Sequence, residues 1–254
     1  MTLSINKTKF IRSLWQKKFR DEHGLFVAEG EKLVGELLPV FSCRLLVAQK
    51  KWLEGHRNFT ADEIIEVNES GMDKITQLKS PPTVLALFAK PDYPTKISFE
   101  NKLTLALDDI QDPGNVGAIL RIADWFGIEQ ALCSEATADV FNSKTIQATM
   151  GAIARVRTQV VNLPKLLSEL PKEIPVYGTF LEGQSVYQAK LADTGIIVMG
   201  NEGKGISDNV AQFVSEKLFI PNFPPHRKSS ESLNVAAAAA IICSEFRRHE
   251  INNL

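Results

Sequence analysis

The chain has 254 residues, of which 44% are hydrophobic and 23% charged, and its formal net charge is −1. This composition fits one large or two smaller globular domains, and the charge balance alone indicates no partner. Three cysteines without C-x-x-C spacing and only four histidines argue against a disulfide framework and a zinc site, so no metal is expected. The start lacks an apolar signal core, and the apolar run 235–243 is about half a membrane span, so we expect a soluble, cytoplasmic protein without membrane contact.

The first part of the chain predicts a small α/β arrangement. Residues 4–20 read as one basic amphipathic helix, with no acidic residue before Asp21. Strands are expected at 24–30, 43–49, 63–67 and 83–89, and helices at 31–41 and about 50–56. Pro91 and Pro94 mark a linker. We therefore predict two domains, 1–95 and 96–254.

From residue 103 onward, short apolar strands alternate with segments of helical length. The strands are predicted at 103–110, 130–135, 156–162, 175–182, 195–202 and 217–222. The helices are predicted at 115–127, 142–152, 163–170, 206–215 and 232–248. This alternation predicts an α/β fold with a mostly parallel sheet and helices on both faces.

Three unusual loops follow predicted strands, at 108–115, 200–207 and 220–234. Ligands collect beyond the carboxyl ends of strands in such sheets. The glycines of the middle loop match neither a P-loop nor the dinucleotide fingerprint, because Lys204 precedes Gly205 and the spacing is G-x-x-G-x-G. A nucleotide-dependent oxidoreductase is therefore disfavoured. A turn that binds no ligand remains an alternative.

Arg121 is the anomaly of the predicted helix 115–127, which Asn115 would cap and Gly127 would end. The helix is apolar on two sides, so it needs the sheet on one side and another layer or subunit on the other. Arg121 lies between the two apolar stripes with Asp124 and with Gly117, which is expected to leave open space beside it. Arg121 either forms a surface pair with Asp124 or contacts a ligand.

In order and spacing, the segments DPGNVGAILRIADWFG, VMGNEGKGIS and IPN…SESLNVAAAA resemble the three motifs of the SpoU (TrmH) family. These are RNA ribose 2′-O-methyltransferases of the SPOUT class. The resemblance covers about residues 103–248, and the N-terminal stretch is similar to the family's small α/β RNA-binding domain. It implies S-adenosylmethionine as cofactor, a trefoil knot, and a homodimer in which Trp125 would lie at the contact. The expected activity is methylation of a ribose 2′-hydroxyl in structured RNA, ribosomal or transfer. A non-catalytic RNA-binding protein that kept the fold is the alternative.

The resemblance also implies the site residues, carried over by position. The predicted catalytic residues are Asn115, Arg121, Glu202, Ser232 and Asn234. The predicted cofactor contacts are Thr179, Gly200, Asn201, Gly203, Gly205, Ile220, Pro221 and Leu233. Whether Arg121 acts as a base or stabilises charge is open, although a guanidinium is very hard to deprotonate.

Two basic segments are candidates for contact with RNA. On the N-terminal helix, the predicted contacts are Lys7, Lys9, Arg12, Lys17, Lys18 and Arg20, which would hold phosphates without reading sequence. The aromatic residues among them, Phe10, Trp15 and Phe19, either face the core or stack on bases. The third motif also carries an insertion at 222–231 that the family usually lacks. Its His226, Arg227 and Lys228 either meet the RNA backbone or form a solvated tip.

Overall fold

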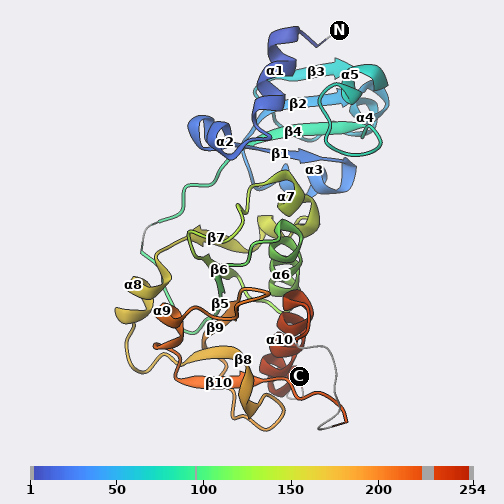
Figure 1. Ribbon diagram of the computed structural model, residues 1–254. Helices are drawn as coiled ribbons and strands as arrows, with labels where there is room; N and C mark the ends of the chain where they lie inside the picture. Colours follow the sequence, from blue (N-terminus) through green and yellow to red (C-terminus); the bar gives the residue numbers. More distant parts are fainter. Residues whose placement is uncertain (1–2, 95, 225–231, 252–254) are drawn as a thin grey trace. The chain divides into compact units, whose positions relative to one another are not determined.

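The computed structural model describes residues 3–94, 96–224 and 232–251, with 249–251 as backbone only (Figure 1). The chain divides into two compact units. Unit 1 contains Met1–Asp92 and Asp139–Ala154, and unit 2 contains Tyr93–Ala138 and Arg155–Leu254. The packing therefore differs from a single cut after residue 95 in two ways: unit 2 begins at Tyr93, and the segment 139–154 belongs to unit 1. The predicted domains 1–95 and 96–254 stay a prediction.

Unit 1 is a four-stranded mixed sheet with helices packed on it. Its elements are α1 (Ile5–Ser13), α2 (Lys17–His23), β1 (Leu25–Glu29), α3 (Glu31–Leu37), β2 (Cys43–Gln49), α4 (Lys50–Gly55), β3 (Ile64–Val67), α5 (Glu69–Asp73), β4 (Val84–Ala89), α7 (Ser143–Thr149) and the 3-10 turn η1 (Ala152–Ala154). The strand order is β1-β4-β2-β3. The strands β1 and β2 each pair antiparallel with β4, and β3 pairs parallel with β2.

Both faces of this sheet are buried. Alternate residues such as Val27, Leu85 and Leu87 join Ile11 and Leu14 of the α1 region in one core cluster. On the other face, the ring of Phe26 lies 5.1 Å from that of Phe141, measured between centroids. Since Phe141 lies in the segment 139–154, this contact helps to explain why the segment belongs to unit 1.

Arg20 is the reason that the predicted helix 4–20 is two helices. Its Nη1 donates to the carbonyl oxygens of Leu14 (2.9 Å) and Trp15 (2.8 Å), which follow the end of α1. Its Nε and Nη2 donate to Asp139 Oδ2 at 3.1 and 2.6 Å. The Arg20 residue is only 2% exposed. Arg20 therefore holds the turn between α1 and α2 and ties the segment 139–154 to it.

Unit 2 is a six-stranded sheet in the order β10-β8-β9-β5-β6-β7, with every neighbouring pair parallel. Its elements are β5 (Leu103–Asp108), α6 (Pro113–Trp125), β6 (Gln130–Cys133), β7 (Arg157–Val160), α8 (Leu163–Ser168), β8 (Val176–Ser185), β9 (Gly195–Gly200), α9 (Asp208–Ala211), β10 (Glu216–Phe219) and α10 (Val235–Ile251). The predicted α/β fold with a parallel sheet is confirmed.

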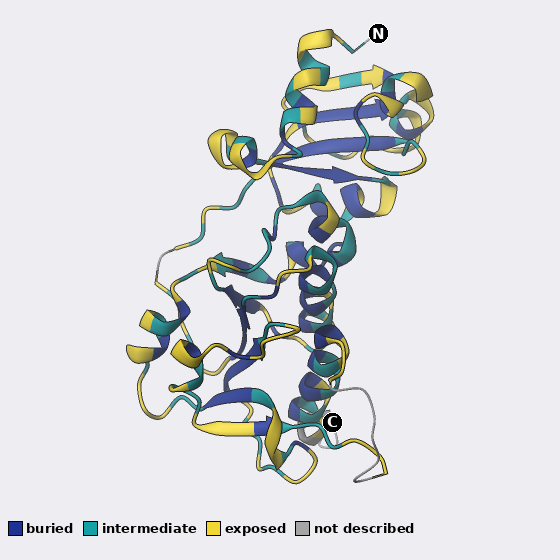
Figure 2. Cartoon of the chain, viewed as in Figure 1, coloured by how far each residue is buried: buried dark blue, intermediate teal, exposed yellow. Residues whose placement is uncertain are grey.

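Helices cover both faces of this sheet, with α8 and α9 on one side and α6 and α10 on the other (Figure 1). The strands between them are mostly buried (Figure 2). Asn234 and Asn115 meet near the starts of α10 and α6, and Arg247 donates to the Phe126 carbonyl near their ends, so the two helices run in the same direction. The alanine run of α10 suits this close packing because its side chains are short.

Two local predictions are wrong. Asp112, not Asn115, caps α6: its side chain accepts from the Asn115 amide, and Pro113 takes the first helical turn. This leaves the Asn115 side chain available for other contacts. Gly117 is buried, so it does not form an open strip beside Arg121. Gly127 has the left-handed φ of +63° that is expected after the helix.

No helix in the described part of the chain is long and apolar enough to cross a membrane.

The ion pair between Arg20 and Asp139 provides a test of how unit 1 is held together. Asp139→Ala should lower the free energy of unfolding by about 3–5 kcal/mol, because it leaves a buried guanidinium unpaired. Asp62→Ala is the matched control, because it breaks an exposed pair with Arg44 and should cost about 0–1 kcal/mol. Urea unfolding followed by tryptophan fluorescence measures both. An equal, small effect of the two substitutions would contradict this role of Arg20.

Candidate active site

The three motif loops leave the sheet of unit 2 at its carboxyl edge. The strands β5, β9 and β10 end at Asp108, Gly200 and Phe219, and they belong to one parallel sheet. In a parallel sheet all carboxyl ends lie at the same edge, where ligands of open α/β sheets bind. The fold thus brings Asn115 into contact with residues that lie 87 and 119 positions further along the chain.

A chain of hydrogen bonds, which we call the amide chain, links one residue from each motif. Asn115 Nδ2 donates to Glu202 Oε1 at 2.8 Å. Asn234 Nδ2 donates to Asn115 Oδ1 at 3.0 Å. Asn234 Oδ1 in turn accepts from the amide of Ala236 at 3.0 Å, at the start of α10. Three of the five predicted catalytic residues are therefore linked through Asn115.

The direction of the amide chain is determined by its two ends. An ionised Glu202 carboxylate can only accept hydrogen bonds, so Asn115 must present its NH₂ group there. The backbone amides at the start of α10 can only donate, so Asn234 must present its oxygen to them. The remaining oxygen of Asn115 then faces the remaining NH₂ of Asn234. No amide in the chain can be reversed without placing two donors or two acceptors together.

The loop after β9 is a tight, internally bonded turn. Asn201 and Gly205 exchange backbone hydrogen bonds of 2.9 Å. Asn201 Oδ1 accepts from the amides of Gly203 and Lys204, and its Nδ2 donates to the Asp109 carbonyl at 2.8 Å. The predicted residues of this loop thus lie together, and the Asn201 side chain shapes the loop from within.

Two of these glycines are required by the loop backbone. A Cβ on Gly200 would lie 2.3 Å from Gly205 C and Ile206 N, so no side chain fits there. Gly205 has a φ of +73°, which is strained for other residues. Gly203 has neither constraint, since a Cβ there would meet no atom closer than 3.7 Å.

Asp108 is a positioning residue that the sequence analysis missed. It is 5% exposed, and its Oδ2 accepts from the Ser207 amide at 2.7 Å, which ties the loop after β9 to the end of β5. The sequence could have indicated it, because two aspartates follow each other at the end of a buried strand, where ligands of such sheets bind.

Arg121 is exposed on α6 and has no hydrogen-bond or ion-pair partner among the residues that the structure describes. The predicted surface pair with Asp124 does not form. Asp124 instead accepts from Arg155, with Nε 2.9 Å from Oδ1 and Nη2 3.0 Å from Oδ2. The pair with Asp124 is therefore wrong, and the contact of Arg121 with a ligand stays a prediction.

The other predicted contacts lie at the same edge of the sheet but are not joined to the amide chain. Thr179 Oγ1 donates to the Val198 carbonyl at 3.1 Å, so its hydroxyl proton is already used between β8 and β9. Ile220 and Pro221 are half-buried after β10. Ser232 and Leu233 are exposed just before α10. Residues His226, Arg227 and Lys228 of the insertion lie outside the described residues.

The predicted RNA contacts in unit 1 divide into two groups. Arg20 is buried against Asp139, so it has no surface to offer RNA, and we remove it from the contacts. Lys7 pairs with Glu63 at 2.5 Å and Lys17 with Asp21 at 3.1 Å. The remaining exposed cations of the segment are Lys9, Arg12 and Lys18. Phe10 and Phe19 pack partly against the core, as the core-facing alternative expected.

The cysteines are not arranged as ligands or nucleophiles. Burial raises the pKa of Cys43 to about 11 and those of Cys133 and Cys243 to about 12, so all three are neutral thiols at neutral pH. Within the described ranges, no group of three or more His, Cys, Asp or Glu side chains could hold a metal ion. The polar groups described at the carboxyl edge are thus the amides of Asn115 and Asn234 and the carboxylates of Glu202 and Asp108.

A family model described as the SpoU rRNA Methylase family matches residues 102–244, more than half of the chain. The chain belongs to this family. A second model, described as the MRM3-like substrate binding domain, matches residues 6–86. The resemblance of the three motifs is thereby confirmed, and so is the expected class of enzyme, a methyltransferase of the SPOUT type.

Relatives match the chain over nearly its whole length. The 23S rRNA (guanosine(2553)-2′-O)-methyltransferase RlmP of Bacillus subtilis is 31% identical over 95% of this chain and 96% of its own. A Porphyromonas gingivalis protein assigned to the TrmH family of RNA methyltransferases is 44% identical, with a TM-score of 0.90 over 98% of this chain and 100% of its own. An AdoMet-bound rRNA methyltransferase of Sinorhizobium meliloti is 30% identical, with a TM-score of 0.85 over 98% and 97%. S-adenosylmethionine is the cofactor of the family, and the catalytic interpretation is favoured over an RNA-binding protein without activity.

The loop glycines of this SpoU family member give a test with a built-in control. Gly200→Ala should destabilise unit 2 by about 2 kcal/mol or more, because the new methyl group overlaps backbone atoms. Gly203→Ala should change stability by less than about 0.5 kcal/mol, because its methyl group meets only ordinary contacts. Differential scanning calorimetry of the full chain measures both. Equal stability of the two variants would contradict the described loop.

Proposed function

We propose that this chain transfers a methyl group from S-adenosylmethionine to a ribose 2′-hydroxyl of structured ribosomal RNA in the cytoplasm. The observation that carries the proposal is the amide chain, which joins Glu202, Asn115 and Asn234. Arg121, on the same helix as Asn115, is exposed and has no partner within the described part of the chain. Ribosomal RNA is favoured over transfer RNA because the full-length relative from Bacillus subtilis is a 23S rRNA 2′-O-methyltransferase. The proposal includes the knotted path of the C-terminal segment that the family resemblance implies.

The residues at the carboxyl edge fit S-adenosylmethionine. The loop after β9 brings backbone close to the site without side chains, because Gly200 excludes a Cβ and Gly203 and Gly205 carry none. Half-buried Ile220 and Pro221 offer apolar surface after the end of β10, which is separated from β9 by β8. Glu202 makes the loop a poor site for a phosphate and a suitable one for a cationic or neutral ligand. Thr179 and Leu233 complete the proposed contacts, with Asn201 shaping the loop.

Arg121 is proposed to act on the RNA side of the reaction. When bound, S-adenosylmethionine supplies the methyl group on its sulfonium centre. A guanidinium can hold the phosphate next to the target ribose and stabilise negative charge on the attacking oxygen. A guanidinium is very hard to deprotonate and is therefore a poor base, so we assign Arg121 charge stabilisation and positioning. Asn115, Asn234 and Ser232 are proposed to orient the ribose, and Glu202 to hold the Asn115 amide.

A homodimer is part of the proposal because α6 keeps an apolar side chain on the surface. Trp125 is 84% exposed at the end of α6, although α10 packs on the same helix. Aromatic residues such as Trp are enriched at protein interfaces relative to the rest of the surface. The family resemblance implies that such an interface lies near the active site.

The dimer should be visible by sedimentation velocity at micromolar concentration, with two chains per particle. Trp125→Glu should raise the dissociation constant of the dimer by about tenfold or more, since it places a charge in an apolar contact. The matched control is Ile64→Glu, at a residue that is 50% exposed on β3 of unit 1. A stable monomer of the unaltered chain would remove the dimer from the proposal.

Arg121 gives the direct test of the proposed reaction. Arg121→Ala should lower single-turnover methylation of ribosomal RNA by roughly 100-fold or more, about 3 kcal/mol, while calorimetric binding of S-adenosylhomocysteine stays unchanged. Arg121→Lys should restore little, because an ammonium lacks the planar fork. The control Arg44→Ala removes an exposed arginine of unit 1 and should leave the rate within about twofold. Normal turnover of Arg121→Ala, or loss of cofactor binding, would overturn this assignment.

A further inference from the structure

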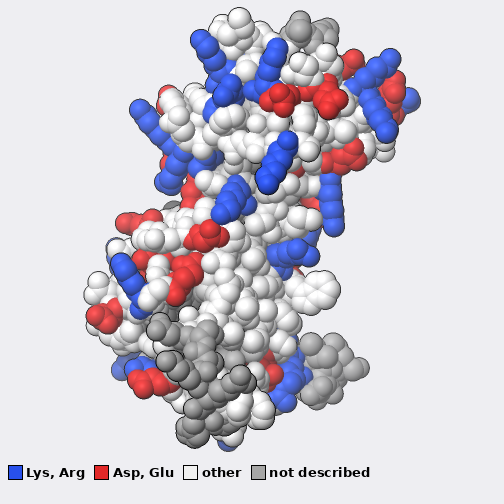
Figure 3. Space-filling model, turned by 45° about the vertical axis from the view of Figure 1, so that its right-hand side comes forward, with Lys and Arg blue, Asp and Glu red and all other residues white. Residues whose placement is uncertain are grey.

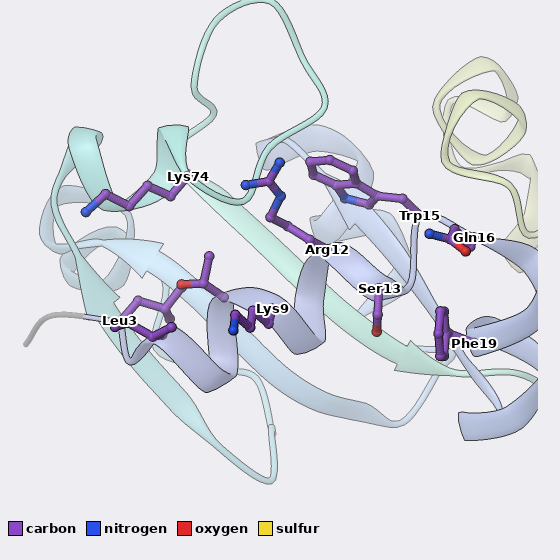
Figure 4. Close-up of a pocket in the computed structure, with 10 residues that line it drawn as sticks. Leu3, Lys9, Arg12, Ser13, Trp15, Gln16, Phe19 and Lys74 are labelled. Atoms are coloured by element: carbon purple, nitrogen blue, oxygen red, sulfur yellow. The ribbon is translucent and has the colours of Figure 1, made fainter.

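Unit 1 carries a hollow of about 600 Å³ along α1 that no part of the proposed reaction uses. Figure 4 shows its lining: Lys9, Arg12 and Trp15 come from α1 and the turn after it, Phe19 from α2, and Lys74 from the end of α5. A volume of this size is in the range of sites for small molecules or single nucleotides. All of these residues belong to unit 1, so the hollow is a feature of that unit alone.

The cations around the hollow are not neutralised by the protein. Lys9, Arg12 and Lys74 have no acidic partner among the described residues, whereas Lys7 and Lys17 nearby in sequence pair with Glu63 and Asp21. Lys and Arg side chains also project from unit 1 on the face shown in Figure 3, with acidic groups between them. The hollow is therefore lined by three cations that have no acidic partner within the described part of unit 1.

The same hollow presents a flat surface. The Arg12 guanidinium carbon lies 4.9 Å from the centroid of the Trp15 ring, and the two side chains lie beside each other in Figure 4. Trp15 is half-buried, and its Nε1 is buried without a hydrogen-bond partner in the described structure. Trp15 is not part of the core cluster that takes up Phe10 and Phe19.

We propose that this hollow binds one unpaired nucleotide of the RNA substrate, outside the reaction site. The base stacks on the surface formed by Arg12 and Trp15, and the flanking phosphates contact Lys9 and Lys74. Aromatic stacking combined with free cations is the arrangement that recognises single-stranded nucleic acid. A duplex cannot use it, because its bases are already stacked and paired. The inference rests on the proposed function, which makes RNA the substrate.

The test measures binding of the full chain to a fluorescein-labelled ten-nucleotide RNA of random sequence, by anisotropy at several salt concentrations. Arg12→Ala and Lys74→Ala should each weaken binding by about fivefold or more. Lys74→Ala should also reduce the salt slope by about 0.7, the value for one phosphate contact on a single strand. Lys51→Ala is the matched control, an exposed lysine of unit 1 that does not line the hollow. It should change affinity by less than about twofold.

Two further arms identify the ligand. The RNA should quench the tryptophan fluorescence of the unaltered chain. Trp15→Phe should remove most of this quenching, while its free energy of unfolding stays that of the unaltered chain. A ten-base-pair duplex should bind without sensitivity to Lys74→Ala. The proposal is overturned if the Arg12 and Lys74 variants bind like Lys51→Ala, if the duplex shows the same sensitivity, or if Trp15→Phe leaves the quenching intact.

The failure of this inference differs from the failure of the proposed function. Binding of S-adenosylhomocysteine and methylation of total ribosomal RNA are measured on the same proteins. If the unaltered chain methylates ribosomal RNA and the hollow variants bind the strand normally, the nucleotide site in the hollow is rejected and the proposed function stands. If these variants lose strand binding but the unaltered chain methylates no ribosomal RNA, the nucleotide site is supported and the proposed function is rejected.

Discussion

The arrangement of the active site depends on one carboxylate that can only accept hydrogen bonds. Glu202 fixes the orientation of Asn115, and the free amides at the start of α10 fix Asn234 from the other end. Because each amide has one donor side and one acceptor side, the three motif loops have a single consistent arrangement. Networks of this kind are stable when every member is satisfied and costly when one is not. The loops after β5, β9 and β10 are thereby held together.

In unit 1 a buried cation, rather than a carboxylate, organises the surrounding hydrogen bonds. Arg20 satisfies two carbonyls after α1 and a carboxylate from a segment 119 residues away. The turn that it holds contains Trp15, which lines the hollow. A structural arginine thus supports the surface on which the free cations Lys9 and Arg12 lie. The basic segment therefore combines a fold-determining charge with charges that are available to a ligand.

The sequence predicts the elements of regular pattern and misses what depends on distant contacts. The alternation of apolar strands and helices predicted the parallel sheet, because burial on both faces leaves that pattern in the sequence. The short helix α5 was missed, since five residues with a central glycine give no periodicity. The place of segment 139–154 could not be predicted, because it follows from the pair of Arg20 and Asp139. The motifs pointed to Asn115 and Glu202, but only the fold shows that they touch.

The central claim is that the amide chain organises a site for ribose methylation. The most direct measurement is methyl transfer from labelled S-adenosylmethionine to ribosomal RNA, with the methylated nucleoside identified by mass spectrometry, for the unaltered chain and for Asn115→Asp. The substitution places a second carboxylate against Glu202 and keeps the size of the side chain. The account predicts a 2′-O-methylated nucleoside from the unaltered chain and a rate lower by roughly 100-fold for the variant. A methyl group on a base, or full activity of Asn115→Asp, would contradict it.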